Sequence, residues 1–291
     1  MTYFTQFLID GLAIGSLYVL VTIGFTLVFG VMGLLNVAHA DLYMVAVFVF
    51  LGVAQDLHFG IVLGAIAGIA AAGLVGALLF WQVIRRIDRN RTLSMFVATL
   101  GVSYFLENLV AKFVQFRTEA VPPLFQSKFY DVSNLHFSTG QIVLVGSTLI
   151  IAVGLSQWLR RSNTGKLMRA VSENTHLAEL VAIDTVRIMA IAVILASVIA
   201  GIGGLLVANT TLSVNPFVAN DVSLKMFAVA VVAGVGSVDG ALVVGLFLGM
   251  IESLTVGYFG SQWETVIGLG AMIIVLLVRP QGLFGKRLRV G

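Results

Sequence analysis

Cysteine is absent from this 291-residue chain, and charged residues make up only 11% of it. A chain without cysteine has no disulfide, no thiolate ligand for a metal and no cysteine nucleophile. Soluble domains carry about 25% charged residues, so this chain has too few charges to cover a surface in water. Its net charge of +3 is small and comes from basic residues in short segments, which gives no patch for nucleic acid.

Apolar residues are abundant instead: 59% of the chain is hydrophobic, and its mean hydropathy is +1.03. Soluble domains lie nearer roughly 45–50% apolar, so a soluble core could not hide this much apolar surface. The sequence also has 31 glycines against 4 prolines, and small residues let membrane helices pack closely. The composition therefore predicts an all-α polytopic integral membrane protein.

Crossing the hydrocarbon core takes about 20 helical residues. The sequence has seven single stretches of suitable length and one longer segment: 7–31, 34–54, 60–84, 92–116, 140–159, 188–209 and 262–278, with 223–257 as the long one. The long segment is interrupted by GVGSVDG at 234–240, and each of its halves is somewhat short for a full crossing. We predict about eight or nine transmembrane or part-spanning helices, with broken helices near 30–41 and 234–240.

Most of the 17 basic residues fall in three segments: Arg85, Arg86, Arg89 and Arg91; Arg160, Arg161, Lys166, Arg169 and Arg187; and Arg279, Lys286, Arg287 and Arg289. Cytoplasmic loops are enriched in lysine and arginine, so we place all three segments, and the C-terminus, in the cytoplasm. Residues 117–139 and 210–222 then lie outside. The N-terminus is also outside if residues 7–54 make two crossings.

The longest polar loop, 160–187, is too short for a nucleotide-binding fold, and the chain has no GxxxxGK[ST] motif. HExxH, GxSxG and paired-carboxylate motifs are also absent. We therefore expect a transport subunit rather than an enzyme, with no cofactor in this chain. Its energy would come from an ion gradient, from downhill diffusion or from a partner chain.

The loop 160–187 reads RRSNTGKLMRAVSENTHLAELVAIDTVR. Its second part predicts a short helix, because Asn174 and Thr175 are good N-caps and Leu177, Leu180 and Val181 follow on one face. A helix with an exposed apolar face lies on the bilayer surface or docks into a groove of a partner. An interfacial helix that only closes the loop is the alternative.

Four segments together resemble one family. GKLMRAVSENTHLAELVAID resembles the cytoplasmic loop of ATP-binding-cassette importer permeases for branched-chain amino acids, and so do GLAIGSLYVLVTIGFTLVFGVMGLLNVAHADLYM (11–44), LKMFAVAVVAGVGSVDGALVVGLFLGMIE (224–252) and RPQGLFG (279–285). Their order is also that of the family, and the match covers most of the chain. The length resembles the shorter of the family's two paralogous permeases, the LivH type.

The resemblance implies a single transmembrane permease domain, 1–291, in the bacterial inner membrane. A paralogous, LivM-like permease would complete the pathway, two ATPase subunits would bind ATP and magnesium, and a periplasmic protein would deliver a branched-chain or related amino acid. Other amino acids, urea, amides and aromatic acids are possible substrates in such systems. An ion-coupled secondary transporter using Glu107 or Asp41, and a channel for a small neutral solute, are the rival functions.

In this interpretation the loop 160–187 is the coupling element that meets an ATPase. The residues implied are Gly165, Arg169, Ala170, Glu173, Asn174, Leu177, Ala178, Leu180 and Ile183. Gly165 would make the turn before the helix, and Leu177, Ala178, Leu180 and Ile183 would form its apolar face. Arg169 and Glu173, four residues apart, would pair with each other or with the partner.

Two Gly-interrupted segments are candidates for the substrate pathway or its gate, because non-helical backbone at membrane depth lines a cavity or is buried in protein. They contribute Asn36, His39, Asp41, Gly234, Gly236, Ser237 and Asp239. A helix that began only after Asp41 would be too short to cross, so we expect the first three in the early turns of the second span, with Asn36 or Asp41 as its cap. The alternative for 234–240 is a plain cytoplasmic hairpin turn with Asp239 in water. His39 and Asp41, two residues apart, would diverge on a helix, so no metal site is predicted.

Charges in the external loops are candidates for docking the periplasmic protein: Arg117, Glu119, Lys128, Asp131, Asp221 and Lys225. Solvated loop charges with no such role are the alternative for each. Of the ionisable residues within spans, Asp10, Glu252 and Glu264 lie near predicted boundaries and are expected to reach water. Glu107 is the deepest, and we expect it to pair with a neighbouring helix.

Overall fold

The computed structural model describes residues 2–87, 92–125, 128–132 and 135–285, and the chain is almost entirely helical there. The α-helices are α1 (Thr2–Met32), α2 (Asp41–Leu51), α3 (Ile61–Gln82), α4 (Thr92–Phe113), α5 (Thr139–Arg161), α6 (Asn163–Glu173), α7 (Thr175–Leu180), α8 (Thr185–Thr211), α9 (Val218–Ala233), α10 (Val238–Phe259) and α11 (Glu264–Val278). Short 3-10 or π turns are η1 (Val37–His39), η2 (Gly52–Asp56), η3 (Ile84–Arg86) and η4 (Ser261–Trp263). In the described ranges, eight helical segments are long and apolar enough to cross a membrane. The predicted all-α polytopic membrane fold is confirmed.

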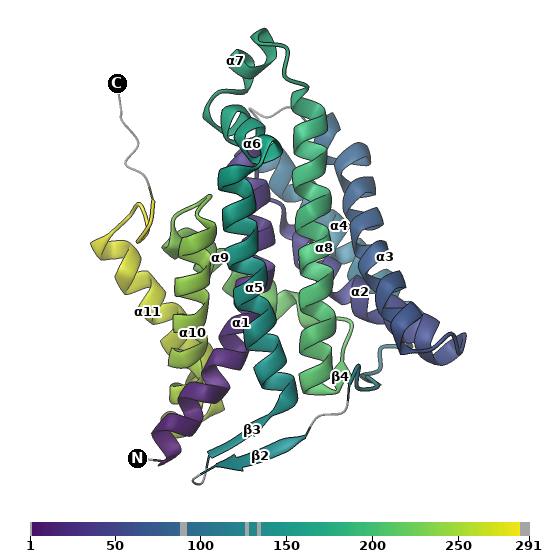
Figure 1. Ribbon diagram of the computed structural model, residues 1–291, viewed down its shortest axis with the longest axis vertical. Coiled ribbons are helices and arrows are strands. Elements are labelled where there is room, and N and C mark those ends of the chain that lie inside the picture. Colours follow the sequence, from purple (N-terminus) through teal and green to yellow (C-terminus); the bar gives the residue numbers. More distant parts are fainter. Residues whose placement is uncertain (1, 88–91, 126–127, 133–134, 286–291) are drawn as a thin grey trace.

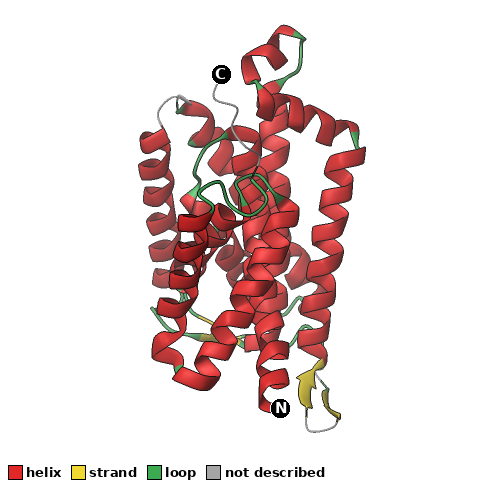
Figure 2. Ribbon diagram, turned by 90° about the vertical axis from the view of Figure 1, so that its left-hand side faces the viewer, coloured by secondary structure: helices red, strands yellow, loops and turns green. Residues whose placement is uncertain are grey.

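Most of the long helices run roughly along the long axis of the molecule, as Figures 1 and 2 show. α6, α7 and the last described residues lie at one end, and the N-terminus and the strands lie at the other (Figure 1). The first end, where η3 and α5 finish in arginines, is called the basic end below, and the second the hairpin end. Arg89, Arg91, Lys286, Arg287 and Arg289 lie outside the described residues.

Small strands, which the sequence pattern did not indicate, cover the hairpin end. β2 (Phe129–Val132) and β3 (Leu135–Ser138) form an antiparallel hairpin, and β1 (Glu119–Ala120) pairs with β4 (Ser213–Val214). Ser138 then starts α5 through a capping box, in which its Oγ accepts from the Gln141 amide and the Gln141 side chain accepts from the Ser138 amide. The strands thereby join the hairpin-end termini of α5 and α8.

The centre of the bundle is formed by α1, α2 and α8, whose sides are largely buried, whereas α4, α5 and α11 leave broad apolar faces exposed. Glycines make the close helix contacts. Gly11 and Gly15 of α1 pack on the backbone of Gly245 and Gly249 in the antiparallel helix α10. This glycine seam confirms that the high glycine content serves close packing.

The predicted break near 30–41 is confirmed, whereas the expectation that Asn36 and His39 lie in the early turns of the second helix, with Asn36 or Asp41 as its cap, is wrong. α2 begins only at Asp41 and runs for 11 residues, about 16 Å. Asn36 and His39 precede it, in an extended segment and in η1, and neither η1 nor α2 has a side-chain cap. The amide of Val37 instead donates to the hydroxyl of Thr99 on α4 at 3.2 Å. A span can be broken here because neighbouring protein satisfies its backbone.

The long segment 223–257 consists of two antiparallel helices, which confirms the predicted break near 234–240. The turn at 234–237 lies between α9 and α10 at the basic end. α9 has 16 residues, about 24 Å, and is short for a crossing. α10 continues to Phe259 and is long enough, contrary to the expectation that both halves would be short.

Candidate functional site

The break in the second span lies inside the helix bundle. Residues 33–40 leave the end of α1 and turn back into the bundle, and Gly33 adopts a φ of 69° at the reversal. His39 packs on Gly24 of α1, where an added Cβ would lie 2.5 Å from its Nε2 atom and 2.9 Å from the carbonyl oxygen of Ala196. Ala196 lies about 16 Å along α8 from its first residue. The ring of His39 is therefore at membrane depth, between α1 and α8.

Three polar side chains of this break are buried without partners. Asn36, His39 and Asp41 are at most 1% exposed, and none of their side-chain nitrogens and oxygens completes a hydrogen bond within the described chain. The ring of His39 approaches the Val21 backbone, and the carboxylate of Asp41 approaches Ser103, in both cases without hydrogen-bond geometry. Buried polar groups are nearly always paired, so this unpaired set is the strongest candidate for a functional site.

One face of α4 follows the break. Thr99, Ser103 and Glu107 are four residues apart and so share that face. Thr99 holds the amide of Val37, while Ser103 and Glu107 lie toward the carboxylate of Asp41. Glu107 is 1% exposed, and its Oε1 atom has no hydrogen bond to the described residues. The sequence left the neighbour of Glu107 open; in the structure Asn220 of α9 lies beside its carboxylate, and Asp41 is an acidic group with which it interacts electrostatically.

The second Gly-rich segment is a tight hairpin turn. Gly234 and Gly236 adopt φ values of 90° and 87°, which only glycine takes readily. Ser237 caps α10 by accepting from the amide of Gly240 at 3.0 Å. Gly236 packs on Gly30, near the end of α1. The turn therefore touches α1 about 9 Å along the helix from the Gly24 contact of His39.

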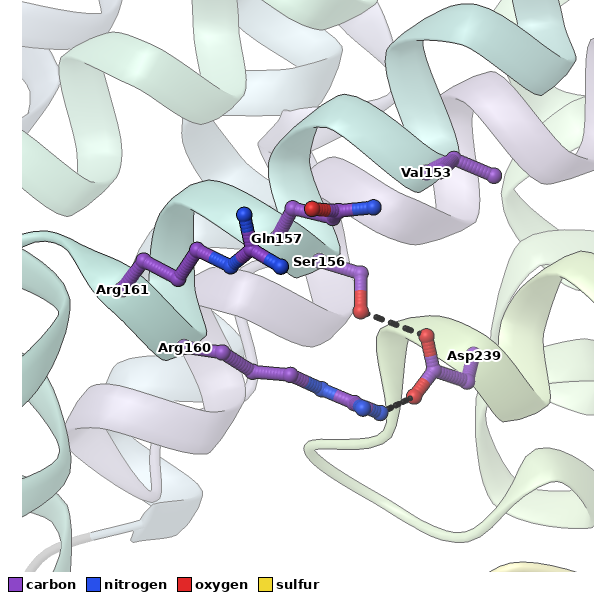
Figure 3. Close-up of a pocket in the computed structure, with 6 residues that line it drawn as sticks. All are labelled: Val153, Ser156, Gln157, Arg160, Arg161 and Asp239. Atoms are coloured by element: carbon purple, nitrogen blue, oxygen red, sulfur yellow. Dashed lines mark hydrogen bonds and ion pairs between the residues drawn. The ribbon is translucent and has the colours of Figure 1, made fainter.

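Asp239 anchors this turn to α5. Its carboxylate accepts a hydrogen bond from Ser156 at 2.6 Å and forms an ion pair with Arg160, as Figure 3 shows. These residues lie on a shallow pocket of about 300 Å³, which Val153, Gln157 and Arg161 complete. The structure thus has the hairpin turn that was the alternative for 234–240, with Asp239 half-exposed and paired. It does not bring Gly234, Gly236, Ser237 and Asp239 to the buried set, and their gating role stays a prediction.

The loop 160–187 folds into α6 and α7 at the basic end (Figure 1). The predicted N-cap is confirmed, because Asn174 accepts from the amide of Leu177 at 3.0 Å. On α7, Leu177 is 58% exposed, and Leu180 and Val181 are each 71% exposed. These three side chains form an apolar patch, called the α7 patch below.

Other details predicted for this loop are wrong. Gly165 lies within α6 rather than in a turn, and a side chain there would overlap the backbone of Leu159. Arg169 donates to the carbonyl oxygens of Leu159 and Arg160 and forms no ion pair with Glu173 in the described structure, whereas the alternative, pairing of these two residues with the partner, stays a prediction. Ala178 and Ile183 pack inward against the core, so they are not part of the α7 patch. Ala170 is half-buried on α6, and Glu173 is exposed at its end.

Five of the six docking candidates lie at or near the hairpin end: Arg117 and Lys128 in exposed loops, Glu119 in β1, Asp131 in β2 and Asp221 at the start of α9. Asp10, on α1, accepts from Gln141 at 3.0 Å and lines a groove of about 560 Å³ between α1, α5, α8 and the β2–β3 hairpin. The prediction for the sixth candidate, Lys225, is wrong, because its side chain is buried between helices rather than exposed in a loop.

Lys225 belongs to a buried charged cluster. Its Nζ atom lies 2.9 Å from Oε2 of Glu252, 2.7 Å from Oε1 of Glu264 and 2.7 Å from the hydroxyl of Tyr18. That hydroxyl donates to Glu252 at 2.6 Å. Glu252 is completely buried, which contradicts the expectation that it reaches water. The cluster ties α1, α9, α10 and α11 together, and no residue pattern in one sequence connects its members.

Replacing Gly24 with alanine is expected to displace His39, because the new methyl group would overlap both the imidazole and the Ala196 carbonyl. Overpacking of this kind costs about 1–3 kcal/mol. We expect a lower thermal unfolding midpoint and slower transport. The variant Gly24→Ala with His39→Ala removes the clashing ring and should recover part of the stability. Equal stability of Gly24→Ala and the unmodified chain would contradict this packing.

Comparison with known proteins identifies the chain. The model of the family described as branched-chain amino acid transport system / permease component matches residues 7–277. The chain belongs to this family. The alternatives of a secondary transporter and of a channel are not favoured by this result, and the predicted permease is confirmed.

Individual relatives match the permease over nearly its whole length. It is 32% identical to the high-affinity branched-chain amino acid transport system permease protein LivH of Escherichia coli K12, over 98% of this chain and 96% of that one. It is 29% identical to the permease protein BraD of Pseudomonas aeruginosa, over 98% and 96%. The probable permease LivH of Methanocaldococcus jannaschii is 27% identical, over 96% and 92%.

A solved structure has the same fold at low sequence identity. PsaBC from Streptococcus pneumoniae in complex with a Fab aligns with a TM-score of 0.53 at 11% identity, covering 97% of the permease and 93% of that chain. At this identity the likeness concerns the fold alone.

Proposed function

We propose that this permease is the transmembrane subunit of an ATP-binding-cassette importer in the bacterial inner membrane. A LivM-like permease would complete its pathway, two ATPase subunits would bind ATP and magnesium, and a periplasmic binding protein would deliver branched-chain amino acids. The family membership and the names of the relatives support this substrate and this assembly. The single observation that carries the proposal is the α7 patch.

The α7 patch is an apolar surface in a polar setting. It lies at the basic end, which we propose faces the cytoplasm together with the C-terminus, because cytoplasmic loops are enriched in lysine and arginine. Leu180 and Val181 are among the most exposed large apolar side chains of the described residues, and α6 and α7 also carry exposed basic and acidic residues. A short apolar helix face of this kind fits a groove of a partner protein. An ATPase subunit is the partner that such an importer requires.

Direct contacts lead from this patch to the broken span. Arg169 of α6 holds the carbonyl oxygens of Leu159 and Arg160 at the end of α5. Arg160 in turn pairs with Asp239 at the start of α10 (Figure 3). The α9–α10 turn then packs on Gly30, beside the point where α1 gives way to the break. Movement of α7 with an ATPase would reach the candidate pathway through these contacts.

Replacing Leu180 with aspartate is expected to abolish ATPase association, because a charge would enter the apolar contact while the fold remains untouched at this exposed position. Co-purification of the permease with its ATPase subunits, followed by ATP-dependent uptake in proteoliposomes, measures the loss. Leu57→Asp is the matched control, since Leu57 is 60% exposed near the opposite end of the bundle. We expect this control to retain the ATPases.

Two outcomes would contradict the proposed function. Normal ATPase association of Leu180→Asp would show that the α7 patch is not the docking surface. Uptake of amino acids by proteoliposomes that contain the permease alone, without any ATPase, would favour the secondary transporter or channel instead.

A further inference from the structure

Asp41 and Glu107 form a pair of buried carboxylates that lacks a cation. Asp41 is fully buried at the start of α2 and Glu107 is 1% exposed on α4, two helices that contact each other, and the carboxylate of Asp41 lies within electrostatic range of Glu107. Neither forms an ion pair with any lysine, arginine or histidine of the described chain. Both oxygens of Asp41 and Oε1 of Glu107 remain without hydrogen bonds there.

The described chain neutralises its other buried acid, Glu252. The buried Glu252 lies 2.9 Å from Lys225 and accepts from Tyr18, and the partly exposed Glu264 lies 2.7 Å from the same lysine. An unpaired charge at membrane depth is costly, and the Lys225 cluster avoids that cost. The contrast indicates that the cation missing from the Asp41–Glu107 pair is supplied from outside the chain.

We propose that Asp41 and Glu107 bind the ammonium group of the amino acid during its passage. This proposal rests on the proposed function and names the chemistry of the same pathway. Ser103 lies beside the Asp41 carboxylate and Asn220 beside that of Glu107, so neutral polar groups flank the pair on α4 and α9. A primary ammonium has three N–H donors, and the pair offers three unused carboxylate oxygens.

Donors for the amino acid's own carboxylate lie just before Asp41 in the chain. Asn36 and His39 are buried with free side-chain nitrogens, and α2 begins at this depth without a side-chain cap. In transporters, the N-termini of broken helices face anionic groups of the substrate, because the helix dipole and the free amides favour negative charge. The break therefore has hydrogen-bond donors for the carboxylate at Asn36 and His39 and an acceptor for the ammonium at Asp41. The facing side of α4 adds a second acceptor, Glu107.

The test uses the complete importer with its binding protein and ATPases in proteoliposomes. Asp41→Asn and Glu107→Gln preserve side-chain shape and remove the negative charge, and each is expected to slow leucine uptake about 10- to 100-fold, the range for losing a hydrogen bond to a charged group. Asp56→Asn is the matched control, because Asp56 is exposed at the outer end of the same broken span. It should keep the unmodified rate.

Stability separates a binding role from a structural one. If the carboxylates only hold helices together, their amide variants lower the unfolding temperature, whereas loss of an uncompensated charge leaves it equal or higher. Asparagine and glutamine also mimic protonated acids, so unchanged uptake would show that the pair is neutral and would overturn the proposal. A lowered unfolding temperature with slow uptake would overturn it as well.

Ligand binding to the purified permease tests the chemistry directly. We expect leucine to raise the unfolding temperature of the unmodified chain but not of Asp41→Asn, and we expect 4-methylpentanoate, which lacks the ammonium, to have no effect. Equal stabilisation by 4-methylpentanoate, or by sodium chloride relative to choline chloride, would overturn the ammonium assignment. If the unmodified importer takes up no amino acid, the proposed function fails too, whereas normal uptake by both variants defeats only this inference.

Discussion

Lys225→Met is expected to lower the free energy of unfolding by about 3–5 kcal/mol, the cost of removing one partner of a buried ion pair. The substitution leaves Glu252 completely buried beside Glu264 and the Tyr18 hydroxyl with no positive charge. The four helices that meet at the cluster would then repel one another at its centre. A large fall in the thermal unfolding midpoint in detergent is the measurement.

A triple variant gives the diagnostic control. Lys225→Met with Glu252→Gln and Glu264→Gln removes the whole charge set and should restore most of the lost stability, because replacing a buried ion pair by neutral groups is often close to neutral. Lys166→Met, at an exposed position of α6, should have no effect. A destabilised triple variant would show that Lys225 acts through packing rather than charge.

Gly249→Ala is expected to separate α1 from α10. An added Cβ would overlap the backbone amide of Gly15 and the carbonyl oxygen of Gly11. Overpacking usually costs about 1–3 kcal/mol, and we expect the upper end or more here, because backbone atoms cannot escape by changing rotamer. Loss of folded protein, or a strongly lowered unfolding midpoint, is the expected result.

Gly101→Ala is the control for this substitution. Gly101 lies on an exposed part of α4, and an added Cβ there would meet no atom within 4 Å. Alanine also favours the helix over glycine, so this variant should be at least as stable as the unmodified chain. If Gly249→Ala behaved like Gly101→Ala, the two helices would not be as close as the glycine seam requires.

The sequence alone predicted the features that depend on local composition. Runs of about 20 apolar residues predicted where spans lie, arginine and lysine marked one end of the bundle, and Gly-rich segments predicted both breaks. The helix after Asn174 and its exposed Leu177 and Leu180 also followed from the spacing of residues along one helix. These signals are local, because crossing a membrane places the same demand on each segment separately.

The tertiary structure decided which polar groups are paired. Lys225 was placed in an external loop, yet its partners are separated from it by 27, 39 and 207 residues in the sequence. The surroundings of Glu107, with Asn220 of α9 beside it and Asp41 of α2 within electrostatic range, depend on how α4 packs on distant helices. The sequence shows that a charge lies within a span, where it is costly, but only the packing of distant helices determines whether another residue neutralises it.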